Sequence, residues 1–118
     1  MSLALWAGIG ALGGLGAVLR FMLAAAVDRH VRSPFPWGIL AVNLSGAFAL
    51  GMVAGARIDG DTRTLVATGL LGAFTTFSTW IVDSLRLGER AGAANVAGSL
   101  ALGLLAVWLG RELGAALF

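Results

Sequence analysis

The sequence predicts an all-α membrane protein with four transmembrane helices, and its composition and charge spacing carry that prediction. Hydrophobic residues make up 58% of the 118 residues, whereas charged residues make up only 12%. Soluble domains carry roughly 25% charged residues, so this chain has too little polar surface for a soluble domain of its size. Charges also divide the chain into four uncharged runs of 19 to 24 residues, namely 1–19, 33–56, 64–82 and 91–110. Each run is close to the roughly 20 helical residues that cross a bilayer.

The four runs are expected to be helices, because a helix satisfies its own backbone hydrogen bonds in lipid. The first span is expected to stay uncleaved, since the N-terminus lacks the positive region of a signal peptide and Arg20 interrupts the apolar run. Short loops make successive helices antiparallel neighbours. The spans are placed, within one transmembrane domain over residues 1–118, at 3–25, 37–56, 64–86 and 92–111.

Glycine is abundant, with 18 residues, and several have the spacing that packs membrane helices. Small residues four apart let helix backbones approach closely in lipid. The pairs with this GxxxG spacing are Gly10/Gly14, Gly51/Gly55 and Gly110/Gly114. Residues 8–13 also match GxGxxG, but a dinucleotide site needs a preceding strand and a soluble βαβ unit, so packing is favoured.

The residue types present exclude several classes of site. The chain has no cysteine, which excludes disulfides and thiol nucleophiles, and its single histidine, His30, lies in a charged segment where solvation is favoured over metal binding. The basic residues are scattered arginines, which gives nucleic-acid binding little support. Without a nucleophile–base pair or a set of metal ligands, an enzyme is not expected.

The arginines are spread almost evenly over the two sides of the membrane. The side with both termini holds Arg57, Arg63 and Arg111, and the other side holds Arg20, Arg29, Arg32, Arg86 and Arg90. Lys and Arg bias sets orientation, and this bias is small. We therefore hypothesise that the chain inserts both ways and pairs as an antiparallel dimer.

Polar residues within the spans are mostly neutral. Ionisable groups at membrane depth are costly and usually functional, and the absence of a carboxylate near a span centre disfavours proton-coupled antiport. Asn43 lies seven residues into the second span, where it is either an interhelical hydrogen-bonding residue, the reading that the residue alone favours, or a donor to a permeating ion. Asn95 and Ser99 are four apart and share a helix face, as a polar track or as packing contacts.

The third span carries the densest polar signal, in residues 72–80 (GAFTTFSTW). Its four hydroxyl residues compete for backbone groups, so a helix break is expected there. Freed carbonyls can hold a cation, and freed N–H groups can favour an anion. Phe77 and Trp80 are three apart and share a face. The alternative is a hydroxyl-rich packing face.

Three stretches in the first three spans resemble motifs of the Fluc (CrcB-like) family of fluoride channels. Residues 13–21 (GGLGAVLRF) resemble GGxxGAxxR, residues 36–46 (PWGILAVNLSG) resemble PxGTLxVNxxG, and residues 69–79 (GLLGAFTTFST) resemble GxxGxxTTFST. The fourth span matches the family by size and position only.

The resemblance implies passive fluoride export, which limits fluoride toxicity, by an antiparallel dual-topology homodimer with two pores. It implies that Asn43 is a pore-lining donor and that Phe77 and Trp80 are pore rings, whose electropositive edges can face an anion. The other residues placed on the fluoride path are Ser78, Asn95 and Ser99. We expect the setting to be the plasma membrane of a prokaryote.

The resemblance also implies a structural sodium ion at the dimer centre, held by the backbone carbonyls of Gly72 and Thr75. Asp83 matches an acidic position after the break, which is why the third span is extended to residue 86. The chain departs from the family at Trp80, where Phe is usual, and at Ile39, where Thr is common.

Two other functions compete with a fluoride channel. A small multidrug-resistance type exporter also has four spans, but it relies on a carboxylate in the first helix, and the first acidic residue here, Asp28, follows that span. A structural membrane subunit without transport activity is the other alternative, and the TTFST stretch is hard to explain in such a protein.

Overall fold

The structure is a computed structural model that describes residues 2–118, and every regular element in this part of the chain is helical. The elements are α1 (Leu3–His30), α2 (Trp37–Gly55), α3 (Gly60–Arg63), η1 (Thr64–Leu71), α4 (Gly72–Phe74), α5 (Ser78–Arg86) and α6 (Glu89–Leu117). The all-α fold class is therefore confirmed.

Four helical stretches are long and apolar enough to cross a membrane, namely Leu3–His30, Trp37–Gly55, Gly60–Arg86 and Glu89–Leu117. The 19 residues of α2 rise about 28 Å, close to the thickness of a bilayer core. The first, third and fourth stretches extend beyond the expected ranges 3–25, 64–86 and 92–111. Charged residues mark where lipid ends, but a helix continues into water as long as its backbone bonds continue.

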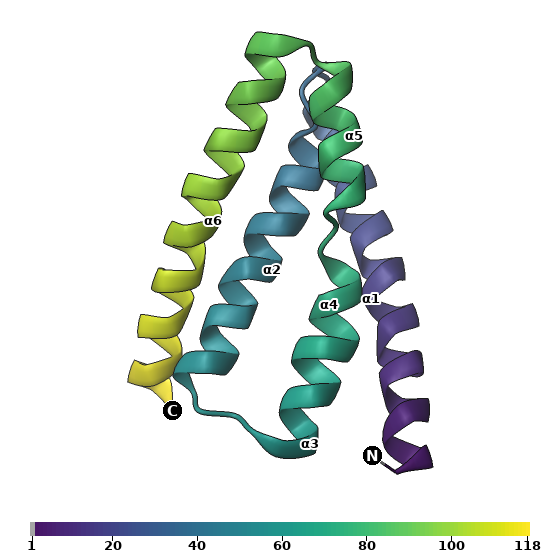
Figure 1. Cartoon of the computed structure of the whole chain (residues 1–118), viewed down its shortest axis with the longest axis vertical. Coiled ribbons are helices and arrows are strands. Elements are labelled where there is room, and N and C mark those ends of the chain that lie inside the picture. The colour runs from purple at the N-terminus through teal and green to yellow at the C-terminus, as the bar shows by residue number, and fades with distance from the viewer. Residues whose placement is uncertain (1) are drawn as a thin grey trace.

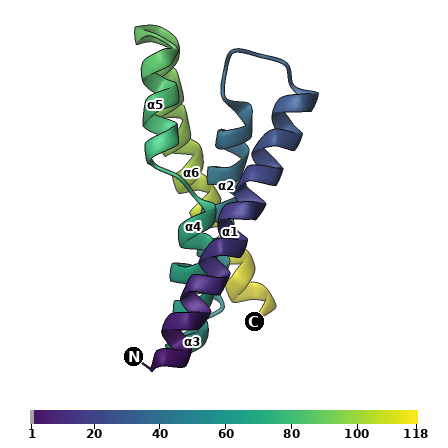
Figure 2. The same cartoon turned by 90° about the vertical axis from the view of Figure 1, so that its right-hand side faces the viewer.

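Both termini lie at one end of the molecule, together with the connection from α2 to α3 (Figure 1). The helix α2 packs on α6 and on α1, while η1 and α4 pack on α1 and α5 packs on α6. In the side view, α5 diverges from α1 at the end opposite the termini (Figure 2). The sharp return from α5 to α6 is made at Gly88, whose φ of 86° suits glycine.

Reciprocal glycine contacts join α2 to α6. A Cβ at Gly51 or Gly55 would collide with a backbone carbonyl of α6, and a Cβ at Gly110 or Gly114 would collide with a backbone carbonyl of α2. Two of the predicted GxxxG pairs therefore pack backbone against backbone. The third pair, Gly10/Gly14 on α1, would meet nothing within 4 Å of an added Cβ.

The protomer buries few large apolar side chains. The buried hydrophobic residues in the described chain are Leu5, Val42, Val53 and Leu71. Long apolar side chains, such as Phe21 at 73% exposure and Leu104 at 73%, point outward instead. A soluble protein does not expose apolar surface on this scale, so lipid or another protein chain covers these residues in the membrane.

The third spanning stretch is interrupted between α4 and α5, as its hydroxyl-rich sequence predicts. Thr75 has extended backbone angles, with φ −79° and ψ 157°, and the helix resumes at Ser78. The segment before the break, η1, is π-helical. Short π-helical segments are frequent at functional sites, which directs attention to this break.

Candidate ion pathway

The break is held by the side-chain amide of Asn43, which reaches it from α2. Asn43 Oδ1 accepts a hydrogen bond from the Thr76 N–H at 2.8 Å, and Asn43 Nδ2 donates to the Thr76 carbonyl at 3.0 Å. Thr76 itself is buried, with 9% of its surface exposed. The amide thus satisfies both backbone groups of a residue that has left the helix, as buried backbone groups require. The second N–H of Nδ2 is not used in either bond.

Two backbone carbonyls at the break have lost their helical partners. In a continuous α-helix the Thr76 N–H would bond to the Gly72 carbonyl, but here Asn43 takes it. The Thr79 N–H would likewise bond to the Thr75 carbonyl, but it is donated to Thr76 Oγ1 at 3.4 Å. Carbonyl oxygens are ligands that hard cations prefer. In residues 2–118 no cluster of three or more His, Cys, Asp or Glu can hold a metal ion.

A pocket of about 280 Å³ lies beside the break and is called the break pocket below. It is lined by Asn43, Ala47, Leu50, Thr75, Thr76, Phe77, Trp80 and Val107. The structure therefore brings the amide and the two aromatic rings of the predicted fluoride path to one cavity. None of its lining residues carries a formal charge.

The two rings meet edge to face. The centroids of Phe77 and Trp80 are 5.6 Å apart, with an interplanar angle of 68°. Phe77 is 72% exposed, so the contact with Trp80 is what orients its ring within the protomer. The Trp80 Nε1 atom is buried and has no hydrogen-bond partner in the described chain. An unpartnered buried donor is uncommon and costs roughly 1–3 kcal/mol.

Ser78 lies on the other side of the break from the two rings. It lines a second pocket, of about 590 Å³, together with Arg20, Asp28, Ile39 and Asp83. Thr76 is the residue that lines both pockets. This polar pocket gathers one cationic and two anionic side chains beside the break. Asp28 also accepts a hydrogen bond from the Gly38 N–H at 3.0 Å, which ties the end of α1 to the start of α2.

Asn95 and Ser99 lie away from the break pocket, in the contact between α5 and α6. Asn95 is 1% exposed and donates from Nδ2 to Ser84 Oγ at 2.8 Å. Ser84 donates in turn to the Trp80 carbonyl at 2.8 Å, and Ser99 donates to Asn95 Oδ1 at 3.3 Å. Both ends of the Asn95 amide are therefore used within the protomer. The chain of bonds fixes the turn of α5 that carries Trp80.

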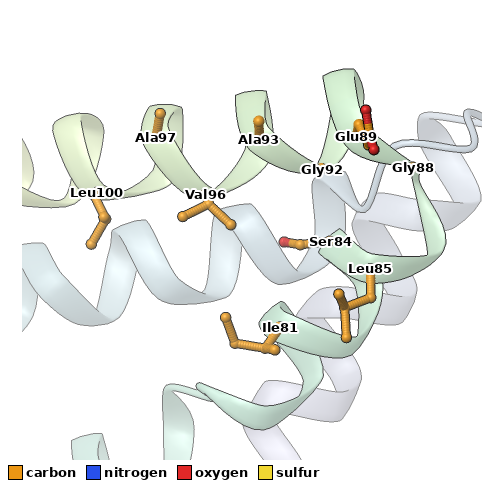
Figure 3. A pocket seen from close by; sticks show the side chains of 10 residues that line it. All are labelled: Ile81, Ser84, Leu85, Gly88, Glu89, Gly92, Ala93, Val96, Ala97 and Leu100. Carbon is orange, nitrogen blue, oxygen red and sulfur yellow. The ribbon is translucent and has the colours of Figure 1, made fainter.

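A third pocket, of about 620 Å³, opens between α5 and α6 (Figure 3). Ile81, Ser84 and Leu85 line it from α5, and Val96 and Leu100 line it from α6. Most of this lining is aliphatic, and the Ser84 hydroxyl is already donated to Trp80. Such a surface does not replace the hydration of an anion, so this pocket is not the candidate path.

Two residues of the site have a role that the sequence did not assign. Thr76 was one hydroxyl in a rich stretch, yet its backbone is what Asn43 holds. Ser84 joins Asn95 to Trp80. The signal for Ser84 is its spacing of four from Trp80, which lets a serine hydroxyl bond back to the preceding turn. That spacing is too common in helices to identify a site alone.

Comparisons with known proteins agree on one family. The family model described as "CrcB-like protein, Camphor Resistance (CrcB)" matches residues 7–111. A protein of Mycolicibacterium paratuberculosis named "Fluoride-specific ion channel FluC 2" is 44% identical over 116 residues, covering 95% of each chain. "Fluoride-specific ion channel FluC" of Opitutus terrae is 47% identical over 123 residues, covering 94% of this chain and 91% of its own.

Proposed function

Because the chain belongs to the CrcB-like family, we propose that it is a fluoride channel that exports fluoride passively across the plasma membrane of a prokaryote and so limits fluoride toxicity. The single observation that carries this proposal beyond the family match is the break pocket. There one amide and two aromatic rings line a cavity beside a helix break, without a formally charged residue in its lining. The family is one of channels, so the protein is not an enzyme.

The lining suits a small, strongly hydrated anion that must pass without being trapped. The second N–H of Asn43 and the edges of Phe77 and Trp80 offer partial positive charge. Conduction requires binding that is favourable enough for entry and weak enough for exit. A fixed cation in the lining would hold the ion more tightly. The cationic side chain of Arg20 instead lines the polar pocket, together with the carboxylates of Asp28 and Asp83, and is not part of the lining of the break pocket.

The small multidrug-resistance alternative gains no support. The relatives compared above are all named fluoride-specific ion channels. Asp28, the first acidic residue in the sequence, binds the backbone of Gly38 near the end of α1 instead of lying at membrane depth. The protein offers no carboxylate at the centre of the first helix for a proton-coupled cycle.

The functional unit in this proposal is an antiparallel dual-topology homodimer with two pores, in contact with membrane lipid. The near-even spread of arginines supports insertion in both orientations. The open backbone at Gly10 and Gly14, on a helix with few buried residues, offers a close-packing face to another helix. The small buried core of the protomer is also what an obligate partner would complete.

A structural sodium ion at the dimer centre is part of the proposal. The Gly72 and Thr75 carbonyls, which have lost their helical donors, are the ligands that this chain would supply. Two oxygens are too few for a hard cation in a closed site. A two-fold axis beside the break would add the same two carbonyls from a second copy. Bound there, the ion would neutralise carbonyl dipoles that are otherwise unpaired.

The direct test is fluoride efflux from liposomes that hold the purified protein, recorded with a fluoride-selective electrode. We expect fluoride to leave when a potassium ionophore balances its charge, and chloride to stay behind. An Asn43→Ala variant that still forms the dimer should lose most of the flux, because the dehydrating anion loses a donor. Undiminished flux through that variant would return Asn43 to a purely structural role.

A further inference from the structure

We propose that Asn43 is also the positioning residue of the sodium site, because its amide keeps the Gly72 carbonyl free. This inference rests on the proposed function. The amide of Asn43 accepts the Thr76 N–H at 2.8 Å, which is the donor that an unbroken helix would give to Gly72. The sodium site and the fluoride path would then depend on a single side chain.

The geometry explains why an amide is needed at this position. Thr76 presents an N–H and a carbonyl to the same side chain, at 2.8 Å and 3.0 Å. An amide is neutral and carries a donor and an acceptor side by side, so it satisfies both groups without adding charge. It also has one N–H left for an anion. An aliphatic side chain satisfies neither backbone group, and the buried Thr76 N–H must then find another acceptor.

The nearest acceptor along the helix is the Gly72 carbonyl. In an Asn43→Leu variant, the Thr76 N–H turns back to this carbonyl and the helix partly closes over the break. Sodium then has to displace a hydrogen bond before it binds. We expect its affinity to fall about tenfold, the loss that one such bond produces. Fluoride flux falls too, because both the donor and the shape of the break pocket are lost.

An Asn43→Asp variant separates the two roles. Charged or protonated, the carboxyl group keeps an oxygen that accepts the Thr76 N–H, so the Gly72 carbonyl stays free. The carboxyl group has no second N–H for an anion. We therefore expect this variant to bind sodium at least as tightly as the parent, because an ionised carboxylate also attracts the cation, and to lose fluoride flux. If Asn43 served only as a fluoride ligand, the Leu variant would bind sodium as tightly as the parent.

The sequence offers a direct spectroscopic probe of the site. Thr75–Thr76 is the only Thr–Thr pair in the chain. Labelling threonine with ¹³C at the carbonyl and ¹⁵N at the amide therefore gives one correlation peak, which reports the Thr75 carbonyl and the Thr76 N–H together. The peak is followed while sodium replaces N-methylglucamine in the dimer purified in detergent. Ser45→Ala is the matched control, since the Ser45 hydroxyl bonds only to carbonyls of its own helix.

A second measurement uses the parent protein alone, so it remains possible if the Asn43→Leu variant does not fold. The chain has two asparagines, Asn43 and Asn95, so a ¹⁵N-asparagine sample shows two side-chain amides. Sodium should shift the amide of Asn43 and leave that of Asn95, which bonds to Ser84, unmoved. An Asn43 amide that stays still while the Thr75 carbonyl shifts would overturn the inference.

The outcomes separate this inference from the function on which it rests. If the Thr75–Thr76 peak of the parent protein does not shift when sodium is added, the sodium site is absent and the inference is wrong. Fluoride conduction is then still tested separately by the flux assay. If the peak shifts at the same sodium concentration in the parent and in the Asn43→Leu variant, the sodium site exists but Asn43 does not position it. We expect the peak to shift with sodium in the parent, Ser45→Ala and Asn43→Asp proteins. In Asn43→Leu we expect the shift to need a sodium concentration about tenfold higher.

Discussion

Replacing Trp80 tests whether its ring belongs to the fluoride path or anchors the helix in the interface. The ring is 5.6 Å from that of Phe77 in an edge-to-face contact, and such pairs contribute about 0.5–1.5 kcal/mol. Trp80→Ala removes this contact from a Phe77 ring that is otherwise 72% exposed. This free energy corresponds to a roughly two- to twelvefold decrease in the equilibrium ratio of the oriented Phe77 ring to its other positions. We expect fluoride flux to fall by at least that factor.

Trp80→Phe is the matched control, because it keeps an aromatic ring against Phe77. It also removes the buried Nε1 donor that has no partner within the protomer, which costs roughly 1–3 kcal/mol. We expect parent-like flux and an unchanged or higher unfolding temperature in detergent. Both variants are assayed by fluoride efflux from liposomes after gel filtration shows that they elute like the parent. If Trp80→Ala elutes like the parent and conducts fluoride like it, the ring is an anchor or a packing residue.

Three further predictions test the dimer, the packing and the α5–α6 contact. A single cysteine at Asp59, in a chain that has none, should react with an impermeant thiol reagent from both sides of native membranes; reaction from one side only contradicts dual topology. Gly51→Ala should destabilise the protein by roughly 1–3 kcal/mol, because its Cβ meets a backbone oxygen of α6, whereas Gly98→Ala has open space and should be neutral; equal unfolding temperatures would show that α2 and α6 are not closely packed. Asn95→Ala should lower the unfolding temperature more than Ser99→Ala does, because it breaks the bond to buried Ser84; lost flux at unchanged stability would instead place Asn95 in the pore.

The sequence predicted the helices well because their signal is simple. Charge spacing located the four apolar stretches, and the glycine spacing predicted close approach of helix backbones, which two of the three pairs make between α2 and α6. The helices α1 and α6 extend beyond the membrane spans that the sequence predicts. Hydropathy measures where lipid ends, whereas the polar turn at Asp28–His30 stays helical in water. The same glycine spacing did not reveal that Gly10 and Gly14 lack a neighbour within the protomer, since spacing does not specify a partner.

The sequence predicts candidate residues for the site but not their contacts. The resemblance placed Asn43, Phe77 and Trp80 on one path, and the structure gathers them around the break pocket. The sequence left Asn43 between two roles, packing or donation. The structure shows an amide engaged with both backbone groups of Thr76, a residue 33 positions away. A contact between distant residues depends on helix packing, so no local pattern could predict it.

The central claim, that this protein is a passive fluoride channel, is tested most directly by its reversal potential. The purified protein is placed in a planar bilayer with a tenfold fluoride gradient and an imposed pH gradient of opposite sense. We predict a current that reverses near the fluoride equilibrium potential, about 59 mV per tenfold gradient, with or without the pH gradient. Fluoride transport without net current, or a reversal potential that follows the pH gradient, would show coupled transport and contradict the account.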